Sequence, residues 1–300
     1  MKLRKFSLAC LLFTAVFVSC NKDDDNPDPD PVEVRDRAVQ EVADQEALLE
    51  YLQTHFYNYE DFENPSEGFD YSIQLDTIDE ANADKTPLID SDLLQTKTYT
   101  FQDVEYKIYI LKVREGEKSQ PKFTDSTFVS YRGELLDQSM FDSSDNPMWF
   151  DLVRTIPGFG QTMTEFKGAS GFQVNSDNTV TFNNDYGVGA MFVPSGLAYF
   201  QNAPSGIPPY SPLVFTFKLY GVNEADHDGD GIPSYMEDLN NNKIISDDNT
   251  DDDMFANYLD PDDDGDFIPT REEIIINEDG TLEFPDKDND GTPDYLDPDN

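Results

Sequence analysis

Acidic residues recur at every second position in a short segment near the C-terminus. The segment places acids at positions one, three, five and twelve and a glycine at position six: Asp226, Asp228, Asp230, Glu237 and Gly231. Calcium is a hard cation that takes several oxygen ligands, and alternating short carboxylates closed by a longer one suit it. The spacing predicts a calcium-binding loop in which the backbone carbonyl of Ile232 is a further ligand.

The same spacing occurs twice more, with a proline at the eighth position each time. The predicted ligands of these two loops are Asp262, Asp264, Asp266, Ile268 and Glu273, then Asp286, Asp288, Asp290, Thr292 and Asp297. In the second loop Phe267 stands where glycine is preferred, so we expect a strained or altered turn there. The alternative is a disordered acidic tail, because carboxylates without an ion repel one another and the segment is poor in apolar residues.

The formal net charge is −42, and 27 acidic against 3 basic residues fall within residues 224–300. Such a charge argues against a nucleic-acid partner, which needs basic surface against phosphate. The two histidines, His55 and His227, stand in a predicted helix and at an intervening loop position. No histidine-based metal or catalytic site is therefore predicted.

The N-terminus carries three basic residues followed by an apolar run from Phe6 to Val18. The run is too short to span a membrane and is typical of a secretory signal. Its end, Ser19-Cys20, resembles a bacterial lipoprotein signal, which implies removal of residues 1–19 and membrane attachment through lipidated Cys20. The alternative is an ordinary signal peptide with an incidental cysteine.

Residues 20–32 are predicted to form an acidic tether. The acids directly after Cys20 resemble export signals of some surface lipoproteins, and a plain solvated tether accounts for them equally well. The expected location is therefore the outer membrane, with display on the cell surface left open.

Residues 33–62 are predicted as an N-terminal helix, because apolar residues follow a spacing of three and four. The stripe consists of Ala38, Val42, Leu49, Leu52 and Phe56. It packs either on the chain's own domain or on a second copy, which would make a homodimer through residues 33–60. Residues 63–96 lack a clear period and are predicted as an irregular linker with a short strand at 71–75.

A strand pattern dominates residues 97–223. The predicted strands are 104–113, 128–136, 149–152, 190–193 and 213–222, and residues 157–167 are the one good helix candidate. Many strands with one helix predict an α+β fold, in which an antiparallel sheet wraps on the helix.

Short motifs follow one another through this region in a fixed order. They are Val129-Ser130-Tyr131-Arg132-Gly133, Phe141-Asp142-Ser143, Ile156-Pro157-Gly158-Phe159, Leu197-Ala198-Tyr199 and Gly206-Ile207-Pro208-Pro209, followed by the strand Leu213–Phe217. In this order they resemble the FKBP-type peptidyl-prolyl cis-trans isomerases. The resemblance covers residues 97–223 and implies an FKBP-like fold, prolyl isomerase activity on Pro-containing polypeptides, and no cofactor for catalysis.

The resemblance also implies an apolar pocket walled by Tyr131, Phe141, Ile156, Phe159 and Phe215. Asp142 would be a hydrogen-bond partner at its edge, Tyr199 would donate its hydroxyl to a substrate carbonyl, and Ile207 would overhang the cleft. The barrier to rotation of an X-Pro bond is about 18–20 kcal/mol and comes from amide resonance. A pocket that strips water from the carbonyl favours the twisted amide without a nucleophile or a proton donor.

Three features depart from the family pattern. Phe159 replaces the usual tryptophan, Phe200 follows Tyr199 where the family has glycine, and residues 168–189 read as an inserted hairpin. They favour an alternative function, a non-catalytic binder of Pro-containing segments in a surface assembly.

No long amphipathic helices flank the acidic loops, so a paired helical calcium domain is not predicted. Residues 224–300 instead resemble thrombospondin type-3 repeats, which are calcium-filled and poor in core residues. Taken together, the sequence predicts a membrane-anchored, exported prolyl isomerase that assists folding of envelope or secreted proteins. A third hypothesis is that the protein is a structural spacer whose main functional part is the calcium module.

Overall fold

The computed structural model describes residues 34–299. The predicted signal segment 1–19, the tether 20–32 and Cys20 lie outside the described residues. Within the described range, no helix combines the length and the apolar character needed to cross a membrane.

The centre of the fold is a six-stranded sheet in which every neighbouring pair of strands is antiparallel, in the order β3-β4-β9-β10-β5-β6. The strands are β3 (Leu94–Phe101), β4 (Val104–Arg114), β5 (Ser126–Leu135), β6 (Met140–Asp151), β9 (Gly187–Val193) and β10 (Leu213–Asn223). A mixture of helix and antiparallel sheet confirms the predicted α+β class.

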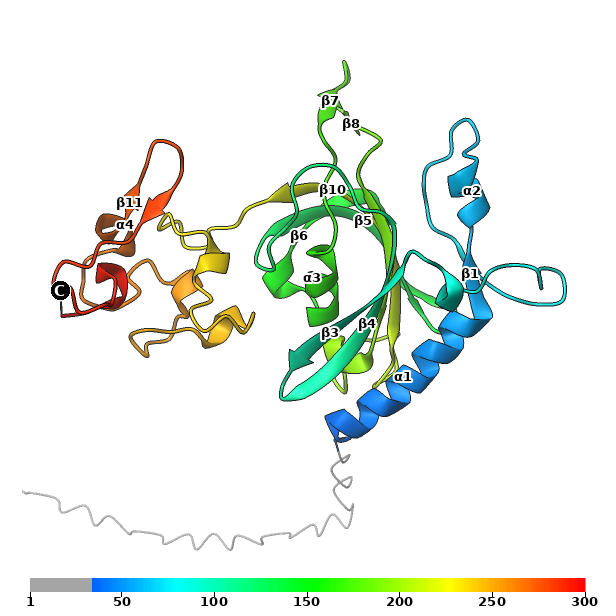
Figure 1. Ribbon diagram of the computed structural model, residues 1–300, viewed down its shortest axis with the longest axis horizontal. Coiled ribbons are helices and arrows are strands. Elements are labelled where there is room, and N and C mark those ends of the chain that lie inside the picture. Colours follow the sequence, from blue (N-terminus) through cyan, green and yellow to red (C-terminus); the bar gives the residue numbers. More distant parts are fainter. Residues whose placement is uncertain (1–33, 300) are drawn as a thin grey trace, which may run out of the picture. The chain divides into compact units, whose positions relative to one another are not determined.

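Helix α3 (Pro157–Met163) lies on the concave side of this sheet (Figure 1). Proline at the first position suits a helix start, because its missing N–H would be unpaired there in any case. The helix ends four residues before the predicted 167, since the chain turns to bury Phe166, whose ring meets Phe217 edge-on at 4.8 Å. Phe159 and Met163 pack into the same core cluster as the sheet's inner residues.

Helix α1 (Arg37–Thr54) covers the other face, so the central strand β9 is buried along its whole length. Asp36 caps the helix, since its carboxylate accepts a hydrogen bond from the Val39 amide at 2.9 Å. The predicted helix over 33–62 is too long. The aromatic-rich stretch His55–Tyr57 forms strand β1, which pairs with β2 (Leu75–Thr77) and is followed by a short helix α2 (Tyr59–Glu63).

The predicted apolar stripe of α1 is wrong in its first half. Ala38 and Val42 are exposed, Leu49 and Phe56 are half-buried, and only Leu52 is fully buried. The buried face begins instead with polar residues, Gln40, Glu41 and Asp44. Glu41 accepts a hydrogen bond from the Lys107 amide of β4, and Asp44 accepts hydrogen bonds from Ser195 in the loop after β9. Polar contacts, which hydrophobic periodicity does not detect, therefore fix this end of the helix.

Residues 63–96 are more ordered than predicted. Ile73 and Leu88, the latter on the short helix η1 (Leu88–Asp90), are buried in the same core cluster as α1. The strand lies at Leu75–Thr77 rather than at 71–75, because Tyr71 takes a left-handed conformation with φ 57°. The segment is therefore part of the packed domain and does not act as a linker.

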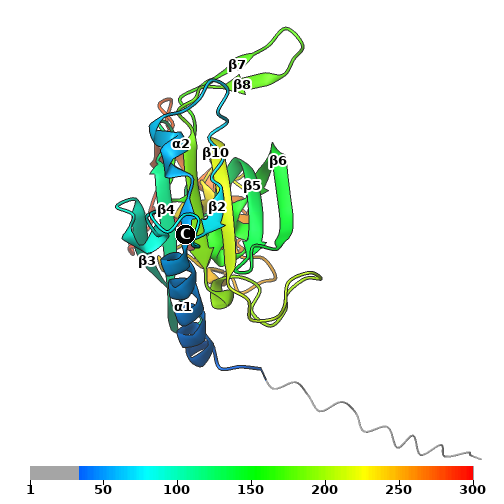
Figure 2. The ribbon, with the colours of Figure 1, turned by 90° about the vertical axis from the view of Figure 1, so that its right-hand side faces the viewer.

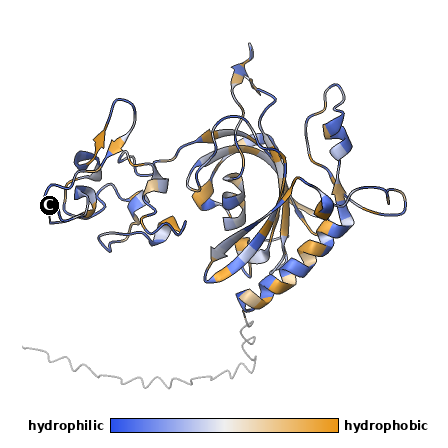
Figure 3. Ribbon diagram, viewed as in Figure 1, coloured by the Kyte–Doolittle hydropathy of each residue, from blue (hydrophilic) through white to orange (hydrophobic). Residues whose placement is uncertain are grey.

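The predicted hairpin within residues 168–189 is present. Strands β7 (Phe172–Val174) and β8 (Val180–Phe182) pair antiparallel and project beyond the main sheet (Figure 2). Apolar and polar residues are mixed both along α1 and along the strands of the main sheet (Figure 3).

Residues 224–299 contain only short elements around a small apolar core of Ile232, Ile274 and Tyr295. The elements are η4 (Ser234–Met236), η5 (Ile245–Asp247), η6 (Asn257–Leu259), α4 (Thr270–Glu273), β11 (Ile275–Ile276), β12 (Leu282–Glu283) and η7 (Asp294–Leu296). This small apolar core contributes little hydrophobic stabilisation, so the acidic loops need another source of stability.

Candidate functional site

Three phenylalanines from distant parts of the chain meet on the concave side of the sheet. Strand β10 contributes Phe215, whose ring lies edge-on to Phe141 of β6 at 5.6 Å and to Phe159 of α3 at 5.7 Å between centroids. Edge-on pairs at this separation are the favoured aromatic geometry. Phe159 and Phe215 are almost fully buried, and Phe141 is half-buried.

The two isoleucines predicted for the site join the same cluster. Ile156 is the residue before α3 and is half-buried, while Ile207 lies in the loop before β10 and is buried. The structure thus brings together all six apolar or aromatic residues predicted from the motifs: Tyr131, Phe141, Ile156, Phe159, Ile207 and Phe215.

A polar pair borders this cluster. Tyr131 of β5 donates its hydroxyl to Asp142 Oδ2 of the neighbouring strand at 2.5 Å. Burial, together with the Asp142 carboxylate, raises the pKa of Tyr131. Burial and the same carboxylate also raise the pKa of Tyr199, whose side chain is 36% exposed. Both phenols therefore stay protonated at neutral pH, so the Tyr199 hydroxyl can donate a hydrogen bond.

Sequence reasoning missed Phe150. Its ring lies edge-on to Tyr131 at 5.3 Å and tilted against Phe159 at 5.6 Å, so it connects the Tyr131–Asp142 pair to the aromatic cluster. Strand β6 is longer than the predicted 149–152, and a register irregularity between Val129 and Tyr131 on β5 changes which β6 residues face inward. The signal in the sequence was the aromatic pair Trp149-Phe150, which alternation alone could not orient.

Helix α1 also holds the loop that carries Tyr199. Asp44 is buried and accepts hydrogen bonds from the Ser195 amide at 2.7 Å and from Ser195 Oγ at 2.6 Å. Ser195 begins the short helix η3 (Ser195–Leu197), which ends two residues before Tyr199. Burial raises the pKa of Asp44, and the hydrogen bonds from Ser195 and Gln40 oppose that rise.

The turn after Tyr199 is backbone-strained. Phe200 has φ 51°, a left-handed conformation that a residue with a side chain rarely adopts. Its buried ring meets Tyr210 edge-on at 4.9 Å and lies 4.2 Å from the Arg37 guanidinium of α1. The chain therefore keeps the turn that glycine makes in the family pattern and stabilises it by packing and a cation–π contact.

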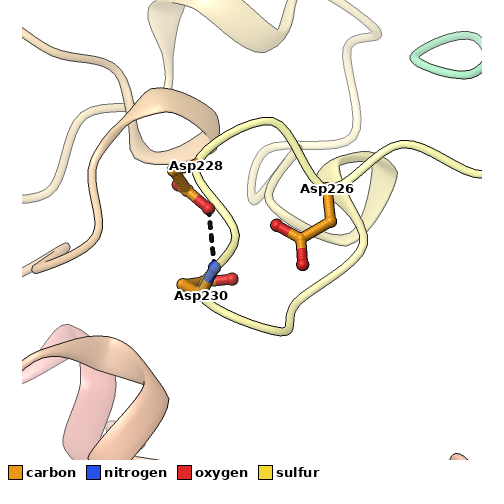
Figure 4. A group of neighbouring side chains, drawn as sticks. All are labelled: Asp226, Asp228 and Asp230. Carbon is orange, nitrogen blue, oxygen red and sulfur yellow. Dashed lines mark hydrogen bonds between the residues drawn. The ribbon is translucent and has the colours of Figure 1, made fainter.

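Three aspartates of the first acidic loop, Asp226, Asp228 and Asp230, lie near one another (Figure 4). Asp226 accepts hydrogen bonds from the amides of Gly229 at 2.8 Å and Gly231 at 3.1 Å, and Asp228 accepts from the Asp230 amide at 3.1 Å. One oxygen of each of the three aspartates lies within 4.8 Å of the others. Asp230 itself accepts a hydrogen bond from the amide of the buried Ile232.

The other two predicted loops repeat this arrangement, with carboxylate groups at Asp262, Asp264 and Asp266 and at Asp286, Asp288 and Asp290. The sixth residue of the first and third loops, Gly231 and Gly291, has φ 103°. The sixth residue of the second loop, Phe267, also has a positive φ of 77°, although it has a side chain. The second loop therefore keeps the same turn and carries the strain that its sequence predicted.

Not every predicted ligand joins such a group. The carboxylate groups in the described part of the chain include neither Glu273 nor Asp297, although both are buried. They do include two sets that the spacing rule missed: Asp251, Asp253 and Asp260, and the buried set Asp230, Glu237 and Asp263. Tertiary proximity makes these sets, so a single-loop pattern could not find them.

Electrostatics in the first loop favour a cation. Burial and the neighbouring carboxylates, Asp228 first among them, raise the pKa of Glu237 to about 10. Neither oxygen of Glu237 has a hydrogen-bond partner. Buried polar groups are normally paired, and a buried carboxylate without a donor is costly. Oxygen-only ligands that are buried and unpaired fit a hard divalent cation.

Comparison with known families defines the class of the central region. Residues 117–220 match the family described as FKBP-type peptidyl-prolyl cis-trans isomerase, and residues 227–285 match a different family, described as BamM C-terminal. The chain therefore contains an FKBP-type peptidyl-prolyl cis-trans isomerase domain. The likeness of residues 224–300 to thrombospondin type-3 repeats stays a prediction.

Curated relatives carry related names. The chain is 31% identical over 132 residues to a probable FKBP-type peptidyl-prolyl cis-trans isomerase FkpA of Neisseria meningitidis, covering 43% of this chain and 41% of the relative. It is 28% identical to the outer membrane protein MIP of Legionella longbeachae, covering 41% of this chain and 45% of that protein. The chain thus spans less than half the length of these relatives.

Among solved structures, the crystal structure of FkpA from Escherichia coli is 26% identical with a TM-score of 0.35, covering 45% of this chain and 53% of that one. A peptidyl-prolyl cis-trans isomerase from Pseudomonas syringae is 21% identical with a TM-score of 0.34, covering 45% of this chain and 84% of that one.

Proposed function

We propose that this protein catalyses cis–trans isomerisation of X-Pro bonds in polypeptides. The observation that carries the proposal is the aromatic cluster around Phe215, bordered by the Tyr131–Asp142 pair and by the exposed hydroxyl of Tyr199. It lies in the part of the chain that matches the FKBP family. Pro-containing segments of other polypeptides are the proposed substrates.

The proposed chemistry needs no proton transfer. The barrier of about 18–20 kcal/mol arises from amide resonance, which the rotating bond loses in the transition state. The cluster supplies an apolar surface against which the proline ring packs, and water is excluded from the carbonyl. Tyr199, held protonated, donates a hydrogen bond that fixes the substrate carbonyl, and Asp142 fixes the Tyr131 hydroxyl at the pocket edge.

The test is a proline-limited refolding assay with the chain from residue 21 onwards. We expect the protein to accelerate refolding, and Asp142→Ala and Tyr199→Phe to lower that acceleration. A hydrogen bond to a charged group contributes roughly 1.5–3 kcal/mol, so a loss of about tenfold or more is expected for Asp142→Ala. Asp145→Ala is the matched control, because Asp145 is exposed on the same strand.

A second candidate function is a non-catalytic binder of Pro-containing segments in a surface assembly. The strained Phe200 turn and the projecting β7–β8 hairpin favour it, since both alter the surroundings of the site relative to the family pattern. A folded protein that binds a Pro-containing peptide without accelerating refolding would favour this binder over the enzyme.

We further propose that the protein is an exported lipoprotein of the outer membrane, anchored through Cys20, which assists folding of envelope or secreted proteins. The support is the sequence of residues 1–20 and the similarity to the outer membrane protein MIP of Legionella longbeachae. Metabolic labelling with palmitate tests the anchor. Incorporation into the wild type that is lost in Cys20→Ala is the expected result, and equal labelling of the two would refute it.

Pairing of two copies through α1 is proposed on the exposure of Val39 and Val42, whose side chains are 70% and 60% exposed on the helix face away from the sheet. Sedimentation of the wild type against Val42→Lys tests this. A dimer that the substitution dissociates is expected, and a monomeric wild type would exclude the pairing.

For the C-terminal module, residues 224–300, we propose structural calcium in the three acidic loops. The ligands would be the carboxylates at positions one, three and five of each loop and, in the first loop, Glu237, with the carbonyls of Ile232, Ile268 and Thr292. Glu273 and Asp297 are the proposed closing ligands of the other two loops. The ion supplies positive charge that lets these carboxylates lie close together, and the residues themselves fix the loop backbone.

A further inference from the structure

Asp263 lies outside the repeating calcium spacing. It is the second residue of the second loop, between Asp262 and Asp264, where the pattern asks for no ligand. Its side chain is nevertheless only 1% exposed. One of its oxygens lies within 4.8 Å of an oxygen of Asp230 and one of Glu237, both of which belong to the first loop.

The three carboxylates are buried and lack partners. Asp230, Glu237 and Asp263 are all at least nine-tenths buried. Both oxygens of Glu237, both of Asp263 and Oδ2 of Asp230 have no hydrogen-bond partner. One oxygen of each residue lies within 4.8 Å of the others, and Asp230 Oδ1 accepts a hydrogen bond from the Ile232 amide. Three converging buried carboxylates repel one another unless a cation lies between them.

We propose that Asp230, Glu237 and Asp263 hold one divalent cation, so that the second loop supplies a ligand to the first. The proposal rests on the proposed calcium module and adds a specific ligand to it. Calcium is the expected ion, since all of the ligands are oxygens.

The backbone of the second loop positions Asp263 for this role. Its amide donates to Oγ1 of the buried Thr270 at 3.1 Å, while Asp262 accepts from the Phe267 amide at 3.1 Å, so the loop closes on itself behind Asp263. The two loops also touch elsewhere: a Cβ at Gly231 would lie 2.7 Å from the Ile276 side chain and 3.2 Å from that of Arg271. Close approach of the two segments is thus built into the fold.

One consequence is that the cation joins residues far apart in the chain. Asp263 follows Glu237 after the long, acidic segment 238–262, which has little apolar surface with which to fold on its own. Closing such a segment carries an entropy penalty that a shared ion offsets. We therefore expect the first two loops to order together as calcium is added, whereas the third loop, residues 286–297, responds separately.

The test is hydrogen–deuterium exchange read by mass spectrometry during a calcium titration of the whole chain. The variant Asp263→Asn is compared with Asp264→Asn, its neighbour in the same loop, which is similarly buried. Loss of a charged ligand should raise the half-saturating calcium concentration for protection of residues 226–237 at least about tenfold in Asp263→Asn. In Asp264→Asn that shift is expected at residues 262–273, with a smaller one at 226–237.

The result that overturns the proposal is an Asp263→Asn variant whose residues 226–237 are protected at the wild-type calcium concentration. An equal shift at residues 226–237 in both variants also overturns it, because the effect would then follow general damage to the second loop. Unchanged exchange in strand β10 verifies that each variant is folded. If calcium protects none of the three loops in the wild type, the proposed calcium module is refuted. If the third loop responds to calcium but Asp263→Asn has no effect on residues 226–237, only the role of Asp263 is refuted.

Discussion

Removal of the Asp44 carboxylate should impair isomerisation although Asp44 lies on a helix outside the pocket. The carboxylate accepts hydrogen bonds from the Ser195 amide and hydroxyl, and a further one from Gln40 Nε2 at 2.7 Å. Ser195 is fully buried, so Asp44→Ala leaves its amide without an acceptor. An orphaned buried donor costs about 1–3 kcal/mol, and we expect a loss of about 2–4 kcal/mol in the free energy of unfolding.

The effect on activity follows from the position of Ser195. Helix η3 leads directly into the Tyr199–Phe200 turn, and the Phe200 amide donates to the Ser195 carbonyl at 3.0 Å. A shift of Ser195 therefore moves the Tyr199 hydroxyl, and a displacement of about 1 Å is enough to lower kcat/KM by roughly tenfold to hundredfold. Asp44→Asn keeps an oxygen acceptor of the same shape and should retain most of the activity.

The assay is proline-limited refolding at a temperature where each variant is folded, with unfolding followed separately by circular dichroism. Glu46→Gln is the control, because Glu46 is exposed on the same helix. A positioning role requires that kcat/KM falls in Asp44→Ala and recovers in Asp44→Asn. If Asp44→Ala is less stable but its folded form has the wild-type kcat/KM, the link from α1 to the site is refuted and Asp44 is structural only.

Three further predictions concern the acids and the strained loop. Burial raises the pKa of Glu41 from 4.5 to about 7, so the folded state binds more protons than the unfolded state between these pH values. The free energy of unfolding therefore falls as pH rises through this window, by about 3 kcal/mol near pH 7. A Glu41→Gln variant that keeps the wild-type pH slope in denaturant unfolding would contradict this prediction. Phe267→Gly should relieve the backbone strain at φ 77° and tighten calcium binding by the second loop about fivefold, a gain of about 1 kcal/mol. Calorimetry measures this affinity, and weaker binding would show that the turn is not strained. A calcium chelator should expose residues 224–300 to protease and leave the sheet domain resistant, and cleavage that ignores calcium would argue against the module.

The motifs predicted apolar side chains that the structure brings into one cluster, but they did not predict the residues that support this cluster. Motifs such as Phe141-Asp142 and Ile156–Phe159 consist of neighbouring residues whose types and order are visible in the sequence, so they predict a candidate site without any knowledge of the packing. Phe150 was not predicted because the direction of its side chain depends on a register irregularity in the β5–β6 pairing. No local sequence pattern encodes that irregularity. The alternation rule holds only between such irregularities.

Helix α1 shows a second limit. Periodicity finds apolar faces, but the buried face of α1 starts with Gln40, Glu41 and Asp44. The sheet and loop partners of Glu41 and Asp44 lie more than sixty residues away in the chain. A buried polar side chain is recognisable only once its partner is known. The same holds for Asp263, whose place outside the spacing pattern hides its convergence with Glu237.

These polar anchors explain how the chain tolerates Phe200 at a position where the family pattern has glycine. A left-handed phenylalanine costs about 1–3 kcal/mol and persists only where its surroundings over-determine it. Those surroundings are the Arg37 guanidinium over its ring, Tyr210 against its edge, and Ser195, which Asp44 holds in place. Two of these three contacts depend on α1, which lies outside the matched region 117–220. The proposed catalytic unit is therefore larger than the region that resembles the family, and α1 belongs to this proposed unit because it fixes the turn that carries Tyr199.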